Sequence, residues 1–144
     1  MPPHKLTDFV KAYDVRGLVP EQLNVDVAWA LGAAFAEVII NREGGTGCVI
    51  GHDMRATSPE LSQAFGKGVT NRGVDVTHIG LASTDGLYFA SGQLDLAGAM
   101  FTASHNPAAY NGIKLCRPAA RPVGQDSGLA DVRAPAQELL AGTA

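Results

Sequence analysis

The chain has 144 residues, of which 46% are hydrophobic and 17% are charged, and its formal net charge is -3. This length suits one domain with its own core, and the composition is typical of a globular protein rather than a disordered one. The negative charge and the lack of a Lys/Arg run argue against a nucleic-acid binder, which usually carries a basic surface.

Targeting and metal-binding patterns are also missing from the sequence. The first ten residues contain charges and no apolar core, so we expect no secretory signal. The longest apolar stretch, residues 28–40, contains Glu37 and is too short to span a bilayer. Cys48 and Cys116 belong to no Cys-x-x-Cys or Cys/His cluster, which predicts two buried, reduced thiols and no zinc site. We expect a cytoplasmic protein with no membrane partner.

Helices and strands are predicted to alternate along the chain. Apolar residues recur at helical spacing after Asn24, a suitable N-cap, as far as the glycine-rich run at 44–47. Ser58 is the expected capping hydroxyl of a second helix, and Gly73 can supply the left-handed residue that ends it. In chain order we expect a helix from 24, a strand at 48–51, a helix at 58–72, a strand at 74–79, a helix at 83–92, strands at 96–101 and 112–116, and a short helix at 127–133.

This alternation predicts the fold class and the domain limits. It is the pattern of a three-layer α/β/α domain with a small mixed sheet of about four strands. The domain is expected to occupy residues 1–133. The shift to Pro, Ala and Gly after Arg117 predicts a linker or a truncated end at 134–144.

The densest group of reactive side chains is Thr-Ala-Ser-His-Asn-Pro at residues 102–107, directly after the strand that ends at Phe101. Catalytic groups in α/β folds often lie on loops beyond the carboxyl ends of strands. Turn signals at 106–107 and 111–112 predict that the chain doubles back, which would bring Lys114 near Ser104. This combination suits phosphoryl chemistry, although Ser, His and Asn are also residues that simply form turns.

Two other enzyme classes fit this segment poorly. The nucleophile elbow of serine hydrolases is absent, because Thr102 and Asn106 occupy its glycine positions. Adjacent residues such as Ser104 and His105 rarely form a nucleophile–base pair. No dinucleotide-binding glycine pattern and no Walker lysine occurs either.

Four segments together resemble a known family. Residues 102–107 closely resemble the active-site serine loop of the α-D-phosphohexomutases, the phosphomannomutase/phosphoglucomutase family. The segments 13–17 (Tyr-Asp-Val-Arg-Gly), 51–55 (Gly-His-Asp-Met-Arg) and 111–114 (Asn-Gly-Ile-Lys) resemble further family motifs in the same order. The resemblance covers about residues 9–133 and identifies the chain as the N-terminal domain I. One departure is His52, where the family usually has arginine.

The resemblance implies the chemistry of the serine loop. Ser104 would carry a phosphoryl group and pass it to a hexose 1- or 6-phosphate through a bisphosphate intermediate. Lys114 would act as general base or acid for the sugar hydroxyl, a role that requires nearby burial or cations to favour the neutral amine. His105 would donate to the transferring phosphoryl group or to the sugar.

The resemblance also implies how phosphate and metal are bound. Arg16 would position phosphate and assist Lys114, with Tyr13 beside it, and Asn106 would shape the loop. A Mg²⁺ ion would bind through the phosphate on Ser104, and glucose or mannose 1,6-bisphosphate would act as activator. Asp53 and Arg55 are expected to form a structural ion pair rather than a catalytic one.

Members of the family are several-fold longer and have four domains around one cleft. The metal loop, the sugar-reading loop and the phosphate clamp belong to the other three domains, and no such motif occurs here. We therefore expect little or no mutase turnover from this chain alone, with hexose phosphates and the remaining domains as its partners, and self-association through the exposed interface as a further possibility. The Pro/Ala-rich end favours a piece of a longer enzyme. The alternative is a natural short, non-catalytic module that binds sugar phosphate or complements the missing domains.

Overall fold

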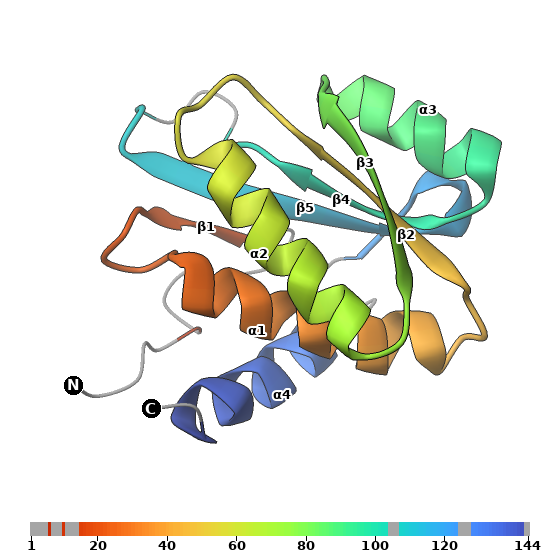
Figure 1. Ribbon diagram of the computed structural model, residues 1–144, viewed down its shortest axis with the longest axis horizontal. Helices are drawn as coiled ribbons and strands as arrows, with labels where there is room; N and C mark the ends of the chain where they lie inside the picture. Colours follow the sequence, from red (N-terminus) through yellow and green to blue (C-terminus); the bar gives the residue numbers. More distant parts are fainter. Residues whose placement is uncertain (1–5, 7–9, 11–14, 104–106, 124–127, 143–144) are drawn as a thin grey trace.

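The structure is a computed structural model that describes residues 6, 10, 15–103, 107–123 and 128–142. Its helices and strands alternate along the chain, as predicted (Figure 1). In order they are β1 (Val15–Leu18), α1 (Val25–Phe35), the π-helical continuation η2 (Ala36–Asn41), β2 (Gly47–His52), α2 (Ser58–Asn71), β3 (Asp75–Leu81), α3 (Thr84–Leu94), β4 (Ala97–Phe101), β5 (Tyr110–Arg117), the 3₁₀ turn η3 (Pro118–Ala120), β6 (Arg121–Pro122) and α4 (Leu129–Gly142).

One mixed sheet runs through the described part of the chain. Its strand order is β1-β5-β4-β2-β3, with the two-residue β6 paired to β5. Strand β2 is parallel to β3 and β4, whereas β5 is antiparallel to β4 and β1. The main order therefore holds five strands rather than the expected four or so. The prediction missed β1, a four-residue strand that contains Gly17 and has β5 as its one partner among the named strands.

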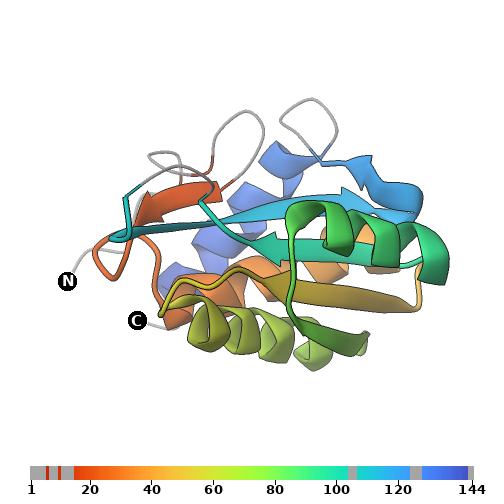
Figure 2. The ribbon, with the colours of Figure 1, turned by 90° about the horizontal axis from the view of Figure 1, so that it is seen from above.

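The sheet lies between two helical layers, as Figures 1 and 2 show together. Helices α1, α2 and α4 cover one face, and α3 lies on the other. Strand β2 shows why both faces need cover, because its side chains alternate between them. Cys48 and Ile50 belong to the core beneath α1 and α2, whereas Val49 packs against Leu87 of α3. The three-layer α/β/α fold is confirmed.

Aromatic packing and two glycines join α1 and α2 to the sheet. Phe65 of α2 is fully buried, with its ring centroid 6.1 Å from that of Phe35 and 5.4 Å from that of Phe101. A Cβ at Gly68 would overlap the carbonyl oxygen of Trp29, and a Cβ at Gly32 would overlap the backbone of Phe65. The two helices therefore approach closely enough that their backbones touch.

The predicted helix ends are correct at two positions and wrong at a third. The side-chain oxygen of Asn24 accepts a hydrogen bond from Val27 N at 3.0 Å, which confirms it as the N-cap of α1. Gly73 follows α2 with a φ of +81°, as expected for a left-handed residue. Ser58, however, is the first residue of α2 rather than its cap, and the capping position is held by Thr57 without a side-chain capping bond.

Helix α4 is longer than the short helix expected at 127–133. It continues through Pro135 to Gly142, across most of the segment for which a linker or truncated end was expected. Its buried residues pack beside α1, and Arg133 Nη1 donates to the carbonyl oxygen of Val10 at 3.1 Å. The helix is therefore part of the domain's core layer.

The two cysteines are free and buried, as predicted. Burial raises the pKa of both Cys48 and Cys116, which keeps these thiols protonated. No helix among the described residues has the length and apolar character needed to cross a membrane.

Candidate active site

The reactive segment follows β4 at the edge of the sheet where the parallel strands end. His52, the last residue of β2, is in register with Phe101 of β4 and with Leu81 of β3. Strand β5 begins at the same edge with Tyr110, because it runs antiparallel to β4. This edge therefore gathers the residues that follow β2 and β4 and the residues that open β5, as α/β folds commonly do at a binding site.

Four of the predicted site residues, Tyr13, Ser104, His105 and Asn106, lie outside the described residues. Their roles stay predictions. The described residues on either side of the reactive segment are held by the backbone of β5. Thr102 N donates to the carbonyl oxygen of Gly112 at 3.0 Å, so the segment leaves the sheet directly beside the start of β5.

The other two predicted site residues, Arg16 and Lys114, are brought to one face of the sheet. Arg16 of β1 is in register with Gly112, and Lys114 lies two residues further along β5. Residues in register on antiparallel strands share a face, as do residues two apart on one strand. Arg16 and Lys114 are thus diagonal neighbours, for which the usual separation is about 7–8 Å. Both are half-buried.

The face that Arg16 and Lys114 share is the one that carries α3. Met100, the register partner of Lys114 on β4, packs with Leu87 of α3 and with Cys116. Both side chains are basic, and they lie next to the residues that follow β4. The roles predicted for Arg16 and Lys114 stay predictions; the structure shows that the two residues share this face.

Close backbone packing beside these cations requires a glycine. A Cβ at Gly112 would overlap the carbonyl oxygen of Val15 and would lie 2.9 Å from that of Thr102. No side chain fits between these two carbonyl groups. Gly112 therefore sets the spacing between β1, β5 and the first residue of the reactive segment.

Asp53 and Arg55 form the expected ion pair, with Arg55 Nε 3.2 Å from Asp53 Oδ2 and side-chain exposures of 8% for Arg55 and 13% for Asp53. Both residues also form hydrogen bonds to the backbone of other segments. Arg55 Nη1 donates to the carbonyl oxygens of Pro107 at 2.8 Å and of Tyr110 at 3.0 Å. Asp53 N donates to the carbonyl oxygen of Phe101 at 2.9 Å. The pair thus reaches both ends of the reactive segment.

Three more polar side chains connect this pair to β5. Ser58 Oγ donates to Asp53 Oδ1 at 2.6 Å, and Asn111 Nδ2 donates to Ser58 Oγ and to Thr57 Oγ1, each at 2.9 Å. Asn111 Oδ1 accepts from Gly112 N at 2.8 Å. Because Ser58 and Asn111 are fully buried, their hydrogen bonds are costly to leave unmade.

The carboxyl pKa of Asp53 reflects this network. Partial burial works to raise that pKa, but hydrogen bonds from Ser58, from the Arg55 backbone and from Thr102, together with the charge of Arg55, outweigh it. The pKa of Asp53 therefore lies below its usual range, and the group is an anion at neutral pH.

Sequence reasoning missed the roles of Asn111, Ser58 and Thr57. It expected the ion pair of Asp53 and Arg55 but not the hydrogen bonds of Arg55 to the carbonyl oxygens of Pro107 and Tyr110. The available signal was positional: each of these residues lies within or just beyond a segment that resembles a family motif, either between β2 and the start of α2 or near the start of β5.

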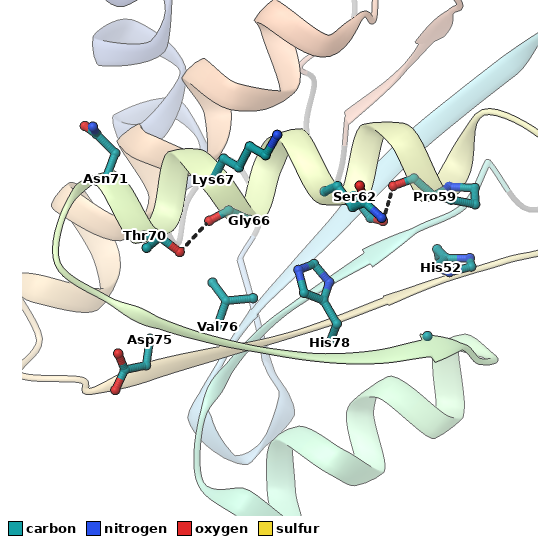
Figure 3. Close-up of a pocket in the computed structure, with 12 residues that line it drawn as sticks. His52, Pro59, Ser62, Gly66, Lys67, Thr70, Asn71, Asp75, Val76 and His78 are labelled. Atoms are coloured by element: carbon teal, nitrogen blue, oxygen red, sulfur yellow. Dashed lines mark hydrogen bonds between the residues drawn. The ribbon is translucent and has the colours of Figure 1, made fainter.

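A separate groove of about 920 Å³ lies between α2 and β3 (Figure 3). His52 and His78 line it from the strands, and Lys67 and Thr70 line it from α2. Burial and the charge of His52 lower the pKa of His78, which favours its neutral form. His52 Nδ1 lies 2.9 Å from the carbonyl oxygen of Asp53, so this groove meets the reactive edge at one end.

The described residues offer no cage for a metal ion. Nowhere in that part of the chain do three His, Cys, Asp or Glu side chains come together as a ligand group. A divalent cation at this edge would need most of its ligands from elsewhere.

Comparison with known proteins identifies the family that this fold and site define. Residues 8–136 match the phosphoglucomutase/phosphomannomutase alpha/beta/alpha domain I. The chain belongs to this family and represents its domain I, as the four sequence motifs predicted.

Relatives of known name agree with this assignment. The chain is 47% identical over 130 residues to a phosphomannomutase of Escherichia coli K12. The aligned region covers 90% of this chain but only 27% of that relative. A phosphomannomutase of Klebsiella pneumoniae is 44% identical over 135 residues, covering 93% of this chain and 83% of that relative. The crystal structure of a phosphoglucomutase/phosphomannomutase family protein from Burkholderia thailandensis has a TM-score of 0.83 at 31% identity, over 90% of this chain and 30% of that one.

Proposed function

We propose that the chain is the phosphoserine-bearing domain of a phosphohexomutase, which interconverts hexose 1-phosphates and hexose 6-phosphates. The observation that carries this proposal is the register of β1 and β5, which puts Arg16 and Lys114 on one face beside the segment that contains Ser104. The 47% identity to a phosphomannomutase supports the same reaction class.

In the proposed step a hydroxyl oxygen of the hexose phosphate attacks the phosphorus atom held on Ser104. The new oxygen–phosphorus bond forms as the bond from Ser104 Oγ to phosphorus breaks. The hydroxyl proton is taken up by Lys114 and passed on to Ser104 Oγ as this oxygen leaves, so the number of protons is unchanged. The product is a hexose bisphosphate, which reorients and returns its other phosphoryl group to Ser104 by the reverse step.

The remaining proposed roles concern charge and position. Arg16 holds a phosphate whose charge is about -1.5 to -2 at neutral pH, and Tyr13 supports it. His105 donates to the transferring phosphoryl group or to the sugar, and Asn106 shapes the loop. Glucose or mannose 1,6-bisphosphate acts as the activator that first charges Ser104.

A Mg²⁺ ion is proposed only as one shared with protein outside this chain. The described residues do not form a ligand set for it, and the phosphate on Ser104 would be its single ligand from this domain. A bound Mg²⁺ would neutralise charge on the transferring group. The proposed step above relies on this chain's own residues.

The chain spans 27% of the length of its E. coli relative, so turnover is proposed for a longer polypeptide and not for this domain alone. The second candidate is a short non-catalytic module that binds sugar phosphate or complements other domains. One observation bears on the length of such a module: the chain accounts for 83% of the K. pneumoniae relative, which is named a phosphomannomutase and is of similar length.

The test compares this chain with the polypeptide encoded by the whole source gene. Each is incubated with hexose 1,6-bisphosphate, Ser104 phosphorylation is mapped by mass spectrometry, and mutase turnover is measured by a coupled assay. We expect phosphorylation at Ser104 and turnover in the longer polypeptide, and loss of both in Ser104→Ala. Turnover by this chain alone would overturn the proposed need for further domains. Phosphorylation at no site in either polypeptide would overturn the mutase assignment and leave the non-catalytic module.

A further inference from the structure

The ion pair of Asp53 and Arg55 is placed to act on the reactive segment rather than on the scaffold alone. An ordinary structural pair joins two elements of the core. Here the acceptors of Arg55 Nη1 are the carbonyl oxygens of Pro107 and Tyr110, which lie one and four residues after the reactive residues 104–106. The pair therefore bonds to the residues that follow the predicted reactive serine.

The other end of the same segment is held by Asp53. Its backbone N–H donates to the carbonyl oxygen of Phe101, and its carboxylate accepts a hydrogen bond from Thr102. Since Arg55 Nε bonds to the same carboxylate, the contacts at the two ends share one pair of side chains. A displacement of Arg55 would disturb both ends together.

Asp53 and Arg55 are themselves fixed by buried partners. Ser58 donates to the Asp53 carboxylate, and Asn111 connects Ser58 to the start of β5. Both Ser58 and Asn111 are fully buried, so the network cannot exchange these bonds for bonds to water without opening the core. This gives the pair the rigidity that a positioning function requires.

We propose that Asp53 and Arg55 are positioning residues that fix both ends of the 102–110 segment and thereby the placement of Ser104 for phosphoryl transfer. This inference rests on the proposed function for its catalytic part, whereas the fixing of the segment's ends is a property of the domain itself. Neither side chain is assigned a contact with the substrate.

The first experiment measures backbone hydrogen exchange at Ala103 and at residues 108–110 in this chain. The variants are Arg55→Met, which removes all donors, and Arg55→Lys, which keeps the charge but cannot reproduce the forked contacts. The matched control is Arg117→Met, which removes an ion pair with Glu43 whose Nε–Oε2 distance is 2.9 Å, at the other end of β5.

We expect exchange at these amides to accelerate about tenfold or more in Arg55→Met and less in Arg55→Lys, with no change in Arg117→Met. Amides of β2 and β4 should exchange as in the wild type. Equal acceleration throughout the sheet would show a purely structural pair and overturn the inference. Unchanged exchange in Arg55→Met would do so as well.

The second experiment measures phosphoryl transfer in the polypeptide encoded by the whole gene. A misplacement of about 1 Å costs on the order of 100-fold in rate, so kcat should fall by about that factor in Arg55→Met with KM nearly unchanged. A kcat equal to that of the wild type, with faster exchange at the segment, would refute the positioning function. If the wild type itself never phosphorylates Ser104, the proposed function fails, and the exchange experiment still decides whether the pair fixes the segment.

Discussion

Replacing Gly112 with alanine tests whether close backbone packing positions the reactive edge. The new Cβ would overlap the carbonyl oxygen of Val15, lie 2.9 Å from that of Thr102 and lie 3.4 Å from Cα of Arg16. All three neighbours are backbone atoms of paired segments, so none can rotate away. Overpacking of this kind costs about 1–3 kcal/mol, and we expect Gly112→Ala to be destabilised by that amount.

The assay is urea unfolding of this chain, supported by thermal unfolding. A loss of about 1–3 kcal/mol corresponds to a fall in Tm of roughly 3–10 °C for a domain of this size. The matched control is Gly92→Ala in α3, where a Cβ would meet nothing within 4 Å. Alanine is favoured over glycine in a helix, so the control should gain up to about 1 kcal/mol.

The free energy of unfolding of Gly112→Ala decides the outcome. If Gly112→Ala unfolds within about 0.5 kcal/mol of the wild type, as ordinary surface substitutions do, the backbone contact at β1 and β5 is not as close as the structure gives it. If it is destabilised but Ser104 is still phosphorylated at the wild-type rate in the full polypeptide, the spacing supports folding only.

Three further predictions concern the proton-transfer group, the core and pH. Lys114→Met should lower phosphoryl transfer in the full polypeptide by about 10²–10⁴-fold, while urea unfolding changes little because the side chain is half-buried; an unchanged rate would remove Lys114 from the mechanism. Phe65→Ala should lower the free energy of unfolding by about 3–5 kcal/mol, since the fully buried ring packs against Phe35 and Phe101; a loss below about 1 kcal/mol would contradict that packing. The pKa of Asp53 is lower in the folded chain than in the unfolded one. The carboxylate therefore stabilises the fold fully above the unfolded pKa of about 3.9, and this stabilisation is lost as the pH falls through the folded pKa. Asp53→Asn should therefore be less stable than the wild type at pH 7, with a difference that shrinks below about pH 4; a difference constant with pH would show that the carboxylate charge is not involved.

The helices and strands that were predicted correctly are those whose pattern of apolar residues matches their burial. Strand β2 reads as a short apolar run, and its side chains are buried on both faces of the sheet. Helix α2 buries Leu61, Phe65 and Val69, which recur every four residues. A pattern that reports burial directly can be interpreted from sequence alone.

Two elements were not predicted correctly: β1 has no such pattern, and the composition of α4 pointed to a linker instead of a helix. Strand β1 has four residues and pairs with β5. Four residues are too few for an alternation of apolar and polar side chains to be recognised in the sequence. Helix α4 does bury Leu129, Val132, Ala136 and Leu140 at helical spacing. Its Pro, Ala and Gly content suggested a linker, but tertiary contact with α1 outweighs the low helix propensity around Pro135.

The candidate site was predictable where it depends on side chains and not where it depends on backbone acceptors. Turn signals placed Lys114 on the returning strand, and the structure confirms that return. The partners of Arg55, by contrast, are the carbonyl oxygens of Pro107 and Tyr110. Every residue has a carbonyl group, so no sequence pattern marks which ones an arginine will bind.

The start of α2 shows why the missed network is more than packing. Thr57 and Ser58 stand where a helix normally uses a hydroxyl to cap its first turn, a bond worth about 1 kcal/mol. Here Thr57 makes no capping bond, and both hydroxyls instead join Asn111, with Ser58 also bonded to Asp53. The first turn of α2 therefore lacks the stabilisation of a capping bond, and Ser58 instead fixes Asp53 beside the reactive segment. Local rules are most often broken at functional sites. This departure agrees with the proposal that the Asp53–Arg55 pair positions the reactive segment.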